Sequence, residues 1–222
     1  MRLLPRRDRD GSPAPEALPT PIVLHAASLV LAYPDEQLLY NLETIRAALA
    51  GTSVEDQFRP LLSHLGGELP GRDGDPTTRL ARLQSFHVQE FDLSRKHSLH
   101  LSYWTDGDTR RRGAALVDAQ RVYRESGLDV DMAGELPDYL PLMLEFTAAS
   151  PGAGLPLLQR FRASLELIRL GLVADSLPHA GVLAAVCGCL PGEPAQTRAE
   201  VQARFGDVQP IEFVGLSESA RG

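Results

Sequence analysis

Apolar residues recur at helical spacing along most of this chain, and no segment shows the alternation of a half-buried β-strand. Within residues 156–172, one apolar stripe is formed by Leu157, Phe161, Leu165, Ile168 and Leu172. The apolar 43% of the chain is mostly leucine and alanine, whereas aromatic residues make up only 6%. The sequence therefore predicts an all-α fold, a single-domain bundle of several helices.

Length and charge limit the class of protein. A chain of 222 residues is long enough for one domain with a substantial core. A net charge of −7 disfavours a nucleic-acid-binding protein, which normally carries a basic excess on one face, and favours a cationic peptide as partner. No apolar run approaches the roughly 18 residues of a membrane-spanning helix, so we expect no stable membrane insertion. Arg6 and Arg7 are not followed by the apolar stretch of an export signal, and we expect a cytoplasmic protein.

Prolines, glycines and capping residues divide the chain into helices between two polar ends. We expect residues 1–20 to be a disordered N-terminal tail, residues 21–205 to be one helical domain, and residues 206–222 to be a flexible C-terminal tail. The expected helices cover residues 22–33, 35–50, 53–65, 76–91, 109–126, 139–149, 156–172, 179–190 and 194–205, with a short helix or turn in residues 93–104.

The most unusual segment is residues 106–112, DGDTRRR, in which three arginines follow an acidic turn at the expected start of a helix. A helix N-terminus favours carboxylates by a few tenths of a kcal/mol to about 1 kcal/mol per charge. The arginines therefore need nearby anions or an external partner. Anions within the chain that could pair with them are Asp106, Asp108, Glu135 and Asp138. A solvated charge run, an internal clamp and a contact with a partner protein all remain open.

Residues that could carry catalysis or bind a metal are few and poorly spaced. Asp106 and Asp108 resemble the opening of a calcium loop, but Arg110 and Val117 occupy positions where calcium needs oxygen ligands. No catalytic triad, nucleophile elbow or phosphate loop is discernible, so we expect no enzyme, no cofactor and no metal. The alternative is a helical metal-binding or redox sensor protein, which would use His87, His97, His100, Cys187 and Cys189.

Apolar and acidic residues gather in residues 91–108 and 135–146. An apolar surface bordered by carboxylates suits a basic amphipathic helix of another protein. We predict a peptide-binding groove with the apolar residues Leu93, Tyr103, Leu136, Tyr139, Leu142 and Phe146. The residues expected to contact the charges of the peptide are Asp106, Asp108, Arg110, Glu135, Asp138 and Glu145.

Three motifs carry a resemblance to a known family. They are FDLSRKHSLHLSYWTDGDTRRRGAALVDAQRVYRESGLDV at residues 91–130, ELPDYLPLMLEF at residues 135–146, and Ala32-Tyr33-Pro34-Asp35 near the start. In these motifs, and less specifically over residues 22–205, the chain resembles the NarJ family of nitrate reductase molybdenum cofactor assembly chaperones. It is also similar to the broader group of redox-enzyme maturation chaperones that includes TorD and DmsD.

This resemblance implies an all-helical fold of the TorD type and a chaperone dedicated to the catalytic (alpha) subunit of respiratory nitrate reductase. Such a chaperone binds the N-terminal segment of the apo-subunit, keeps the subunit open for molybdenum cofactor insertion and delays its attachment to the membrane. Proteins that deliver the cofactor are further expected partners. The resemblance is compatible with a monomer or with a weak or swapped dimer, for which residues 66–75 could serve as a hinge.

Overall fold

The computed structural model describes residues 20–67, 75–107 and 110–206, and within them the chain forms eleven α-helices. They are α1 (Thr20–Leu31), α2 (Glu36–Leu49), α3 (Glu55–Gly66), α4 (Pro76–His87), α5 (Leu101–Asp106), α6 (Arg110–Glu125), α7 (Leu140–Ala149), α8 (Pro151–Arg160), α9 (Arg162–Ala174), α10 (Ala180–Gly188) and α11 (Arg198–Phe205). A π-helical turn, η1 (Val88–Asp92), extends α4. Among the described residues β pairing is limited to one isolated bridge, so the predicted all-α class is confirmed.

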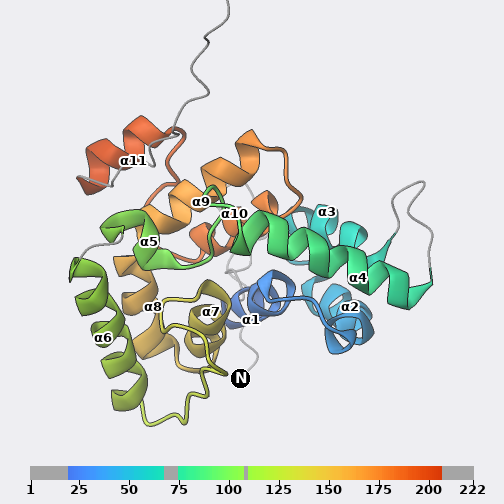
Figure 1. Ribbon diagram of the computed structural model, residues 1–222, viewed down its shortest axis with the longest axis horizontal. Coiled ribbons are helices and arrows are strands. Elements are labelled where there is room, and N and C mark those ends of the chain that lie inside the picture. The colour runs from blue at the N-terminus through green and yellow to red at the C-terminus, as the bar shows by residue number, and fades with distance from the viewer. Residues whose placement is uncertain (1–19, 68–74, 108–109, 207–222) are drawn as a thin grey trace, which may run out of the picture.

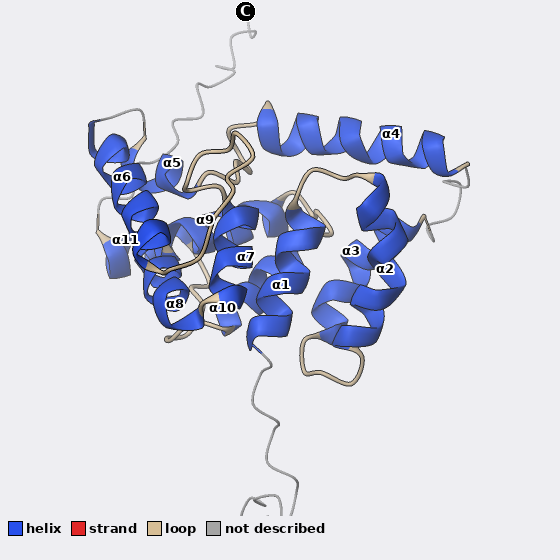
Figure 2. Cartoon of the chain, turned by 90° about the horizontal axis from the view of Figure 1, so that it is seen from below, coloured by secondary structure: helices blue, strands red, loops and turns tan. Residues whose placement is uncertain are grey.

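Helix α1 lies between α7 on one side and α2 on the other (Figure 1, Figure 2). It also contacts α10. Seven of its 12 residues are buried, as expected from a sequence that is apolar nearly all round, because such a helix needs neighbours on several sides. The buried hydroxyl of Ser28 donates to the His25 carbonyl at 2.7 Å, so this polar group is satisfied within the helix.

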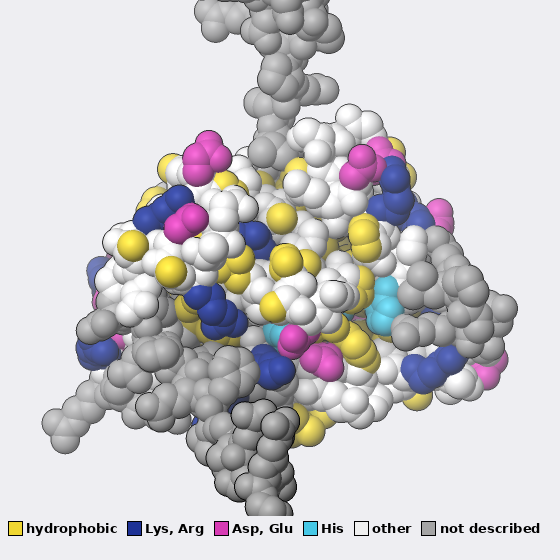
Figure 3. All heavy atoms as spheres, turned by 90° about the horizontal axis from the view of Figure 1, so that it is seen from above, with side chains coloured by type: hydrophobic (Ala, Val, Ile, Leu, Met, Phe, Trp, Pro, Cys, Tyr) yellow, Lys and Arg dark blue, Asp and Glu magenta, His cyan; other side chains and the backbone are white. Residues whose placement is uncertain are grey.

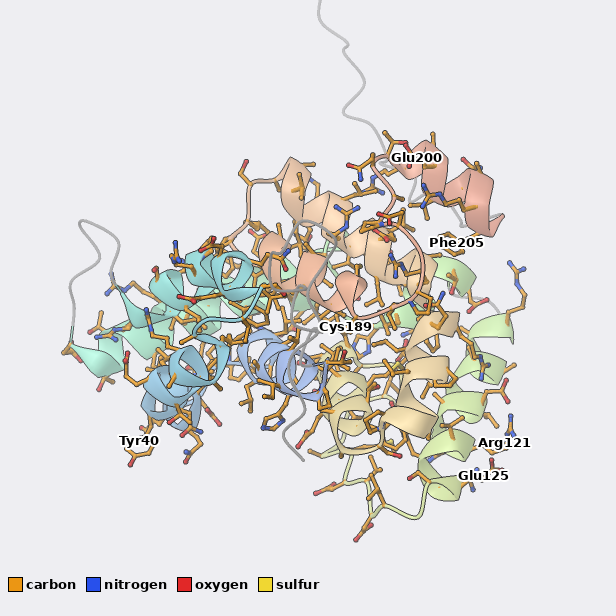
Figure 4. The ribbon with its side chains drawn as sticks, turned by 180° about the vertical axis from the view of Figure 1, so that it is seen from behind. Tyr40, Arg121, Glu125, Cys189, Glu200 and Phe205 are labelled. Atoms are coloured by element: carbon orange, nitrogen blue, oxygen red, sulfur yellow. The ribbon has the colours of Figure 1, made fainter. Side chains whose placement is uncertain are left out.

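The other helices flank α1 in two groups. Helices α2, α3 and α4 lie on one side, and α5, α6 and α8 lie on the other (Figure 1). Helices α9 and α10 pack against each other and link the groups, since α9 contacts α5 while α10 contacts α3. On α6, Ala119 and Tyr123 are buried, whereas Arg121 and Glu125 point outward (Figure 4). Helix α6 therefore has one side toward the core and another toward solvent.

Two helix starts follow directly from local chemistry. Asp35 caps α2, and its carboxylate accepts the backbone N–H of Leu38 at 2.7 Å. Asp75 caps α4 and accepts the N–H groups of Thr77 and Thr78 at 3.0 and 3.1 Å. Both caps satisfy donors that have no partner within the first turn of a helix, which is why the predicted starts agree with the structure.

Two predicted helix boundaries are wrong. Pro156 does not open a helix but lies inside α8, which begins at Pro151, and the expected continuous helix of residues 156–172 is interrupted at Phe161. There the backbone leaves α geometry, and the Phe161 N–H bonds to the Leu158 carbonyl at 3.0 Å in a tighter turn. Helix α11 starts at Arg198 instead of near residue 194, because the Thr197 side chain caps it.

A buried polar network joins residues 99–102 to residues 138–140. The Leu101 N–H donates to the Asp138 carbonyl at 3.0 Å, and the Leu140 N–H donates to the Leu99 carbonyl at 2.9 Å. The Asp138 side chain is fully buried, and its Oδ2 accepts the N–H and the hydroxyl of Ser102 at 2.9 and 2.5 Å. Two segments that are far apart in the sequence are thus held together at the N-terminal end of α7.

Neighbouring helices are connected to the same network. The Tyr123 hydroxyl of α6 donates to the Pro137 carbonyl at 2.7 Å, and the Ser164 hydroxyl of α9 donates to the Leu101 carbonyl at 2.7 Å. The Arg112 guanidinium donates to the Ser102 hydroxyl at 3.3 Å. Arg112 thus contacts the Asp138 network through Ser102, while a direct pairing of the arginines with the four named carboxylates stays a prediction.

Candidate functional site

A groove lies between α1, α2 and α7 and is continued by the loop before α7. It consists of two adjoining cavities of about 260 and 610 Å³, which share Leu29, Asn41, Ile45 and Glu145. We call it the α1–α2–α7 groove. Its first cavity is lined by Ser28, Leu29, Ala32, Tyr33, Asp35, Gln37, Leu38, Asn41, Ile45, Asp131, Met132, Ala133, Glu135, Tyr139, Pro141, Leu142 and Glu145. The second adds Pro21, Ile22, His25, Ala26, Thr44, Ala48, Ala148 and Ala149.

The second cavity of the groove is apolar and lined by small side chains. Ala26 of α1, Ala48 of α2 and Ala148 of α7 come from three helices, and each leaves the space that a larger side chain would fill. Ile22, at the same end, is 44% exposed although it is a large apolar residue. Exposed apolar surface inside a concave site gains free energy when another apolar surface covers it.

The border of the groove is acidic. Asp35, Asp131, Glu135 and Glu145 line it and are all exposed, while no lysine or arginine of the described residues lines either cavity. By contrast, the face in Figure 3 carries basic and acidic side chains side by side. The Asp35 and Asp131 carboxylates accept backbone N–H groups of Leu38 and Ala133. Four carboxylates without a cation among the lining residues create a negative potential that attracts a cationic ligand.

Tyr139 connects the groove to the buried network. Its backbone forms the isolated bridge with His100, and the two rings lie 5.5 Å apart between centroids. Burial raises the pKa of the Tyr139 hydroxyl, and the negative charges of Glu135 and Asp92 raise it further, against a hydrogen bond with the Tyr33 backbone. The hydroxyl is therefore neutral at physiological pH and links the start of α7 to the end of α1.

The structure brings together four of the residues predicted from the sequence. Glu135, Tyr139, Leu142 and Glu145 all line the α1–α2–α7 groove. Leu136, in the same loop, is 41% exposed beside Glu135, and Leu93 is 77% exposed directly after η1. These two leucines lie outside the lining of the groove.

Two other predicted residues face the interior. Phe146 is 3% exposed and packs edge-on against the Tyr123 ring, with centroids 4.6 Å apart. The Asp138 carboxylate lies inside the network described above, so a cation of a bound peptide does not reach it. Neither side chain lines the groove. Phe146 lies on the side of α7 that faces the core, and Asp138 precedes the helix.

The remaining predicted residues belong to the α5–α6 region. Tyr103 is half-buried on α5, with its ring 6.2 Å from the Trp104 ring, and Asp106 ends that helix. The Thr105 hydroxyl donates to the Asp106 carboxylate at 3.1 Å. Asp108 and the Arg110 side chain lie outside the described part of the structure. Tyr103 and Asp106 do not line the α1–α2–α7 groove.

Helices α1 and α2 contribute groove residues that were not predicted from the sequence. On α2, Asn41, Thr44, Ile45 and Ala48 line the groove at spacings of three and four residues, which places them on one side of the helix. This side is less apolar than the buried side formed by Leu38, Leu42, Ile45 and Leu49. Tyr40, by contrast, is 83% exposed and points away from the body of the molecule (Figure 4). The sequence signal that could have indicated this part of the groove is the side of α2 with Asn41, Thr44 and Ala48, whose polar and small residues lie next to the buried leucines.

The histidines considered for a metal site have other surroundings. His97 is 1% exposed between the carboxylates of Glu90 and Asp175, each 3.2 Å from a ring nitrogen. His87 packs against Tyr33 and Phe91, and burial lowers its pKa. Among the described residues, no group of three or more His, Cys, Asp or Glu side chains is arranged to hold a metal ion.

The cysteines considered for redox chemistry are unreactive in character. Cys187 is buried, and Cys189, labelled in Figure 4, is partly buried. Burial raises the pKa of the Cys187 thiol to about 12 and that of Cys189 to about 11. Both thiols are therefore protonated at neutral pH, whereas a reactive cysteine needs thiolate character.

None of the described helices is long and apolar enough to cross a bilayer.

The sequence of this chain matches a known protein family. A family model described as "Nitrate reductase delta subunit" matches residues 48–169, which include α3 to α8 and most of α9. The nitrate reductase molybdenum cofactor assembly chaperone NarJ of Escherichia coli K12 is 41% identical over 131 residues, covering 59% of this chain and 52% of that protein. The probable chaperone of the same name from Bacillus subtilis is 33% identical over 129 residues, covering 58% and 66%.

Two further similarities extend over more of this chain. The nitrate reductase-like protein NarX of Mycobacterium tuberculosis H37Rv is 36% identical over 175 residues, which are 78% of this chain and 25% of that protein. These matches span between a quarter and two thirds of the relatives' own lengths. The crystal structure of a putative redox enzyme maturation protein from Archaeoglobus fulgidus superposes with a TM-score of 0.54 at 23% identity, covering 76% of this chain and 91% of the other. That likeness supports the fold.

Proposed function

Because the chain belongs to the nitrate reductase delta subunit family, we propose that it is an assembly chaperone for the catalytic subunit of a respiratory nitrate reductase. In this proposal the protein binds the N-terminal segment of the apo-subunit, keeps the subunit competent for molybdenum cofactor insertion and delays its attachment to the membrane. It acts in the cytoplasm, beside the proteins that deliver the cofactor, and catalyses no reaction itself. The names of the Escherichia coli and Bacillus subtilis relatives support the role in cofactor assembly.

The chemistry of the α1–α2–α7 groove is the observation that carries the proposal. It combines an apolar, small-residue cavity with four carboxylates, and no lysine or arginine in the described part of the chain lines it. An amphipathic helix with arginines or lysines on its polar side matches both features. Its apolar side would cover Leu29 and Ala48, and its cations would lie near Glu135 and Glu145.

The length of the groove sets the size of the client segment. Helix α1 has 12 residues and lies along it, which corresponds to about 18 Å. A client helix of about three turns fits this length. A segment that folds only when it binds loses conformational entropy in the process, so its binding is reversible, as release after maturation requires.

The predicted residues outside the groove have separate places in this proposal. Asp92 and Glu135 lie near Tyr139, because the charges of both raise its pKa. Leu93 and Leu136 directly follow these two acids and are exposed, so we assign them to an apolar edge beside the groove. Tyr103, Asp106, Asp108 and Arg110, near the junction of α5 and α6, are assigned to a second contact with the client beyond its N-terminal segment.

A charge reversal tests the groove. Calorimetric titration of the client's N-terminal peptide into the Glu145→Lys protein should give an affinity about tenfold weaker than for the wild type, since attraction becomes repulsion. Glu193→Lys is the matched control, because Glu193 is exposed, lies outside the groove and gives the same change in net charge. The loss should shrink at high salt. Equal affinities for the wild type and the two variants would exclude this groove as the client site.

A further inference from the structure

We propose that residues 1–9 of the chain, MRLLPRRDR, bind in the α1–α2–α7 groove of their own molecule and compete there with the client segment. The competition rests on the proposed function, whereas occupation of the groove does not. In this arrangement the chaperone carries its own weak occupant, which a client must displace.

Charge complementarity selects this segment. Residues 1–9 contain Arg2, Arg6, Arg7 and Arg9 against a single acid, Asp8, and they include Leu3 and Leu4. The groove offers four carboxylates and an apolar cavity, and within residues 20–67, 75–107 and 110–206 no lysine or arginine lines it. The other parts of the chain outside the described residues lack this match. Residues 68–74 hold one arginine against two acids, and residues 207–222 hold one arginine against three acids.

The position of the segment also fits. The described chain begins at Thr20, and the next two residues, Pro21 and Ile22, already line the second cavity. From there the groove follows α1 for about 18 Å toward Asp35 and Glu135. Residues 10–19, DGSPAPEALP, would form the connection, and ten residues of extended chain span up to about 31 Å. The connection is therefore long enough for the chain to turn back and place the arginines beside the carboxylates.

Because residues 1–9 are tethered to the groove by a short connection, they can compete with a client even if they bind weakly. A segment tethered by a short flexible linker has an effective concentration of about 1 mM at its site. A tethered occupant with a dissociation constant of about 0.2 mM would weaken the apparent affinity for a client about sixfold. Because much of its attraction is electrostatic, this competition weakens as salt rises.

The first experiment measures competition in the full chain. Replacement of Arg2, Arg6, Arg7 and Arg9 by serine should strengthen the binding of the client's N-terminal peptide about threefold to tenfold, because the occupant is removed. The Asp8→Ser, Asp10→Ser double variant is the matched control and should weaken client binding, because the segment becomes more cationic. Unchanged client affinity in the arginine variant would overturn the competition.

A second experiment needs no client. A photo-crosslinking benzoylphenylalanine placed at position 4 of the full-length protein should react within the same molecule with residues of α1, α2, α7 or the loop at residues 131–139. The reaction should be lost when Glu135→Lys and Glu145→Lys are combined. Crosslinks elsewhere in the chain, crosslinks to a second copy, or a pattern unaffected by the two substitutions would overturn occupation of the groove. If the client peptide binds no form of the protein, the proposed function fails, and these crosslinks still decide the inference.

Discussion

Oδ2 of Asp138 accepts two hydrogen bonds from Ser102, one from the backbone N–H at 2.9 Å and one from the hydroxyl at 2.5 Å. Burial by itself raises the pKa of Asp138, but the hydrogen bonds from His100 and Ser102 outweigh it, and the net pKa is lowered. An ionised carboxylate is thus held in the interior. It fixes the start of α7, whose other face lines the groove, relative to α5.

We predict that Asp138→Ala destabilises the protein by about 3 kcal/mol, because the hydroxyl and N–H of Ser102 lose a charged acceptor inside the core. Urea denaturation followed by circular dichroism measures the change. Glu135→Ala, three residues away at an exposed position, is the control and should change stability by less than about 0.5 kcal/mol. Equal denaturation midpoints for the two variants would show that the network contributes little.

A second buried network holds the C-terminal part of the fold. The Arg162 guanidinium is bound to Glu166 at 2.8 Å and donates to the Cys187 carbonyl at 2.9 Å, while Arg169 contacts the same carboxylate at 2.9 Å. We expect Glu166→Ala to cost about 3–5 kcal/mol, since it leaves two arginines with an uncompensated buried charge. Thermal unfolding measures it, with the exposed Glu193→Ala as comparison. A small loss for Glu166→Ala would contradict this account.

The crossing of α7 and α8 depends on a glycine. A methyl group at Gly154 would lie 2.4 Å from Cα of Thr147, whereas one at Gly152, on the same helix, meets nothing within 4 Å. Gly154→Ala should therefore destabilise the protein by about 1–3 kcal/mol through overpacking. Gly152→Ala should be neutral or stabilise it by up to about 1 kcal/mol. Chemical denaturation of the pair decides, and equal stabilities would show that the helices separate easily.

Filling the groove should block the client without unfolding the protein. Ala48 is exposed and lines the second cavity, while Ala47, also exposed, does not. We predict that Ala48→Phe weakens binding of the client peptide about tenfold by occupying the apolar cavity, and that Ala47→Phe leaves it unchanged. Fluorescence anisotropy with a labelled peptide measures both. Similar losses in both variants would indicate that the peptide binds over α2 in another way.

Stability should depend on pH through His179. Its ring is buried and stacks on Phe86, and burial lowers its pKa to about 3, with nearby histidines adding to the effect. Between this value and the ordinary pKa of about 6.5 the unfolded chain binds a proton that the folded chain does not, so stability falls as pH decreases below about 6.5. The contribution is at most about 1.4 kcal/mol per pH unit.

Denaturation midpoints between pH 7 and pH 5 check this dependence. The His179→Gln protein should show a shallower loss of stability on acidification than the wild type. His25→Gln is the comparison variant, because it makes the same substitution at an exposed histidine of the groove. Parallel slopes for the wild type and His179→Gln would mean that other groups control the acid response.

The sequence predicted local structure well where one residue decides it. Asp75 caps its helix as expected, because a carboxylate beside the first turn satisfies N–H groups whatever the rest of the chain does. Asp35, expected as the first residue of its helix, lies one position earlier and caps it. The predicted helix start at Pro156 is wrong, because α8 starts at Pro151 and contains Pro156. A proline inside a helix is tolerated when packing against neighbouring helices offsets its low helix propensity.

The candidate site was harder to predict, and α7 shows why. Its sequence, LPLMLEFTAA, is apolar at nearly every position, so hydrophobic periodicity does not distinguish the side facing the core from the side facing the groove. Leu142 and Glu145 face the groove, whereas Phe146 faces the core. The contribution of α1 and α2 was missed for a related reason, because their groove residues lie about 100 positions before α7 in the chain.

By itself the sequence determined the helical class, most helix ends and the family resemblance, because these depend on residue spacing, capping and motifs within short segments. Only the tertiary structure decided that Asp138 is an internal acceptor and that Glu135 and Glu145 share a groove with Ile45 and Ala48. The physical reason is that burial and concavity arise when distant helices pack together, and each side chain then takes its role from neighbours that its own segment does not specify.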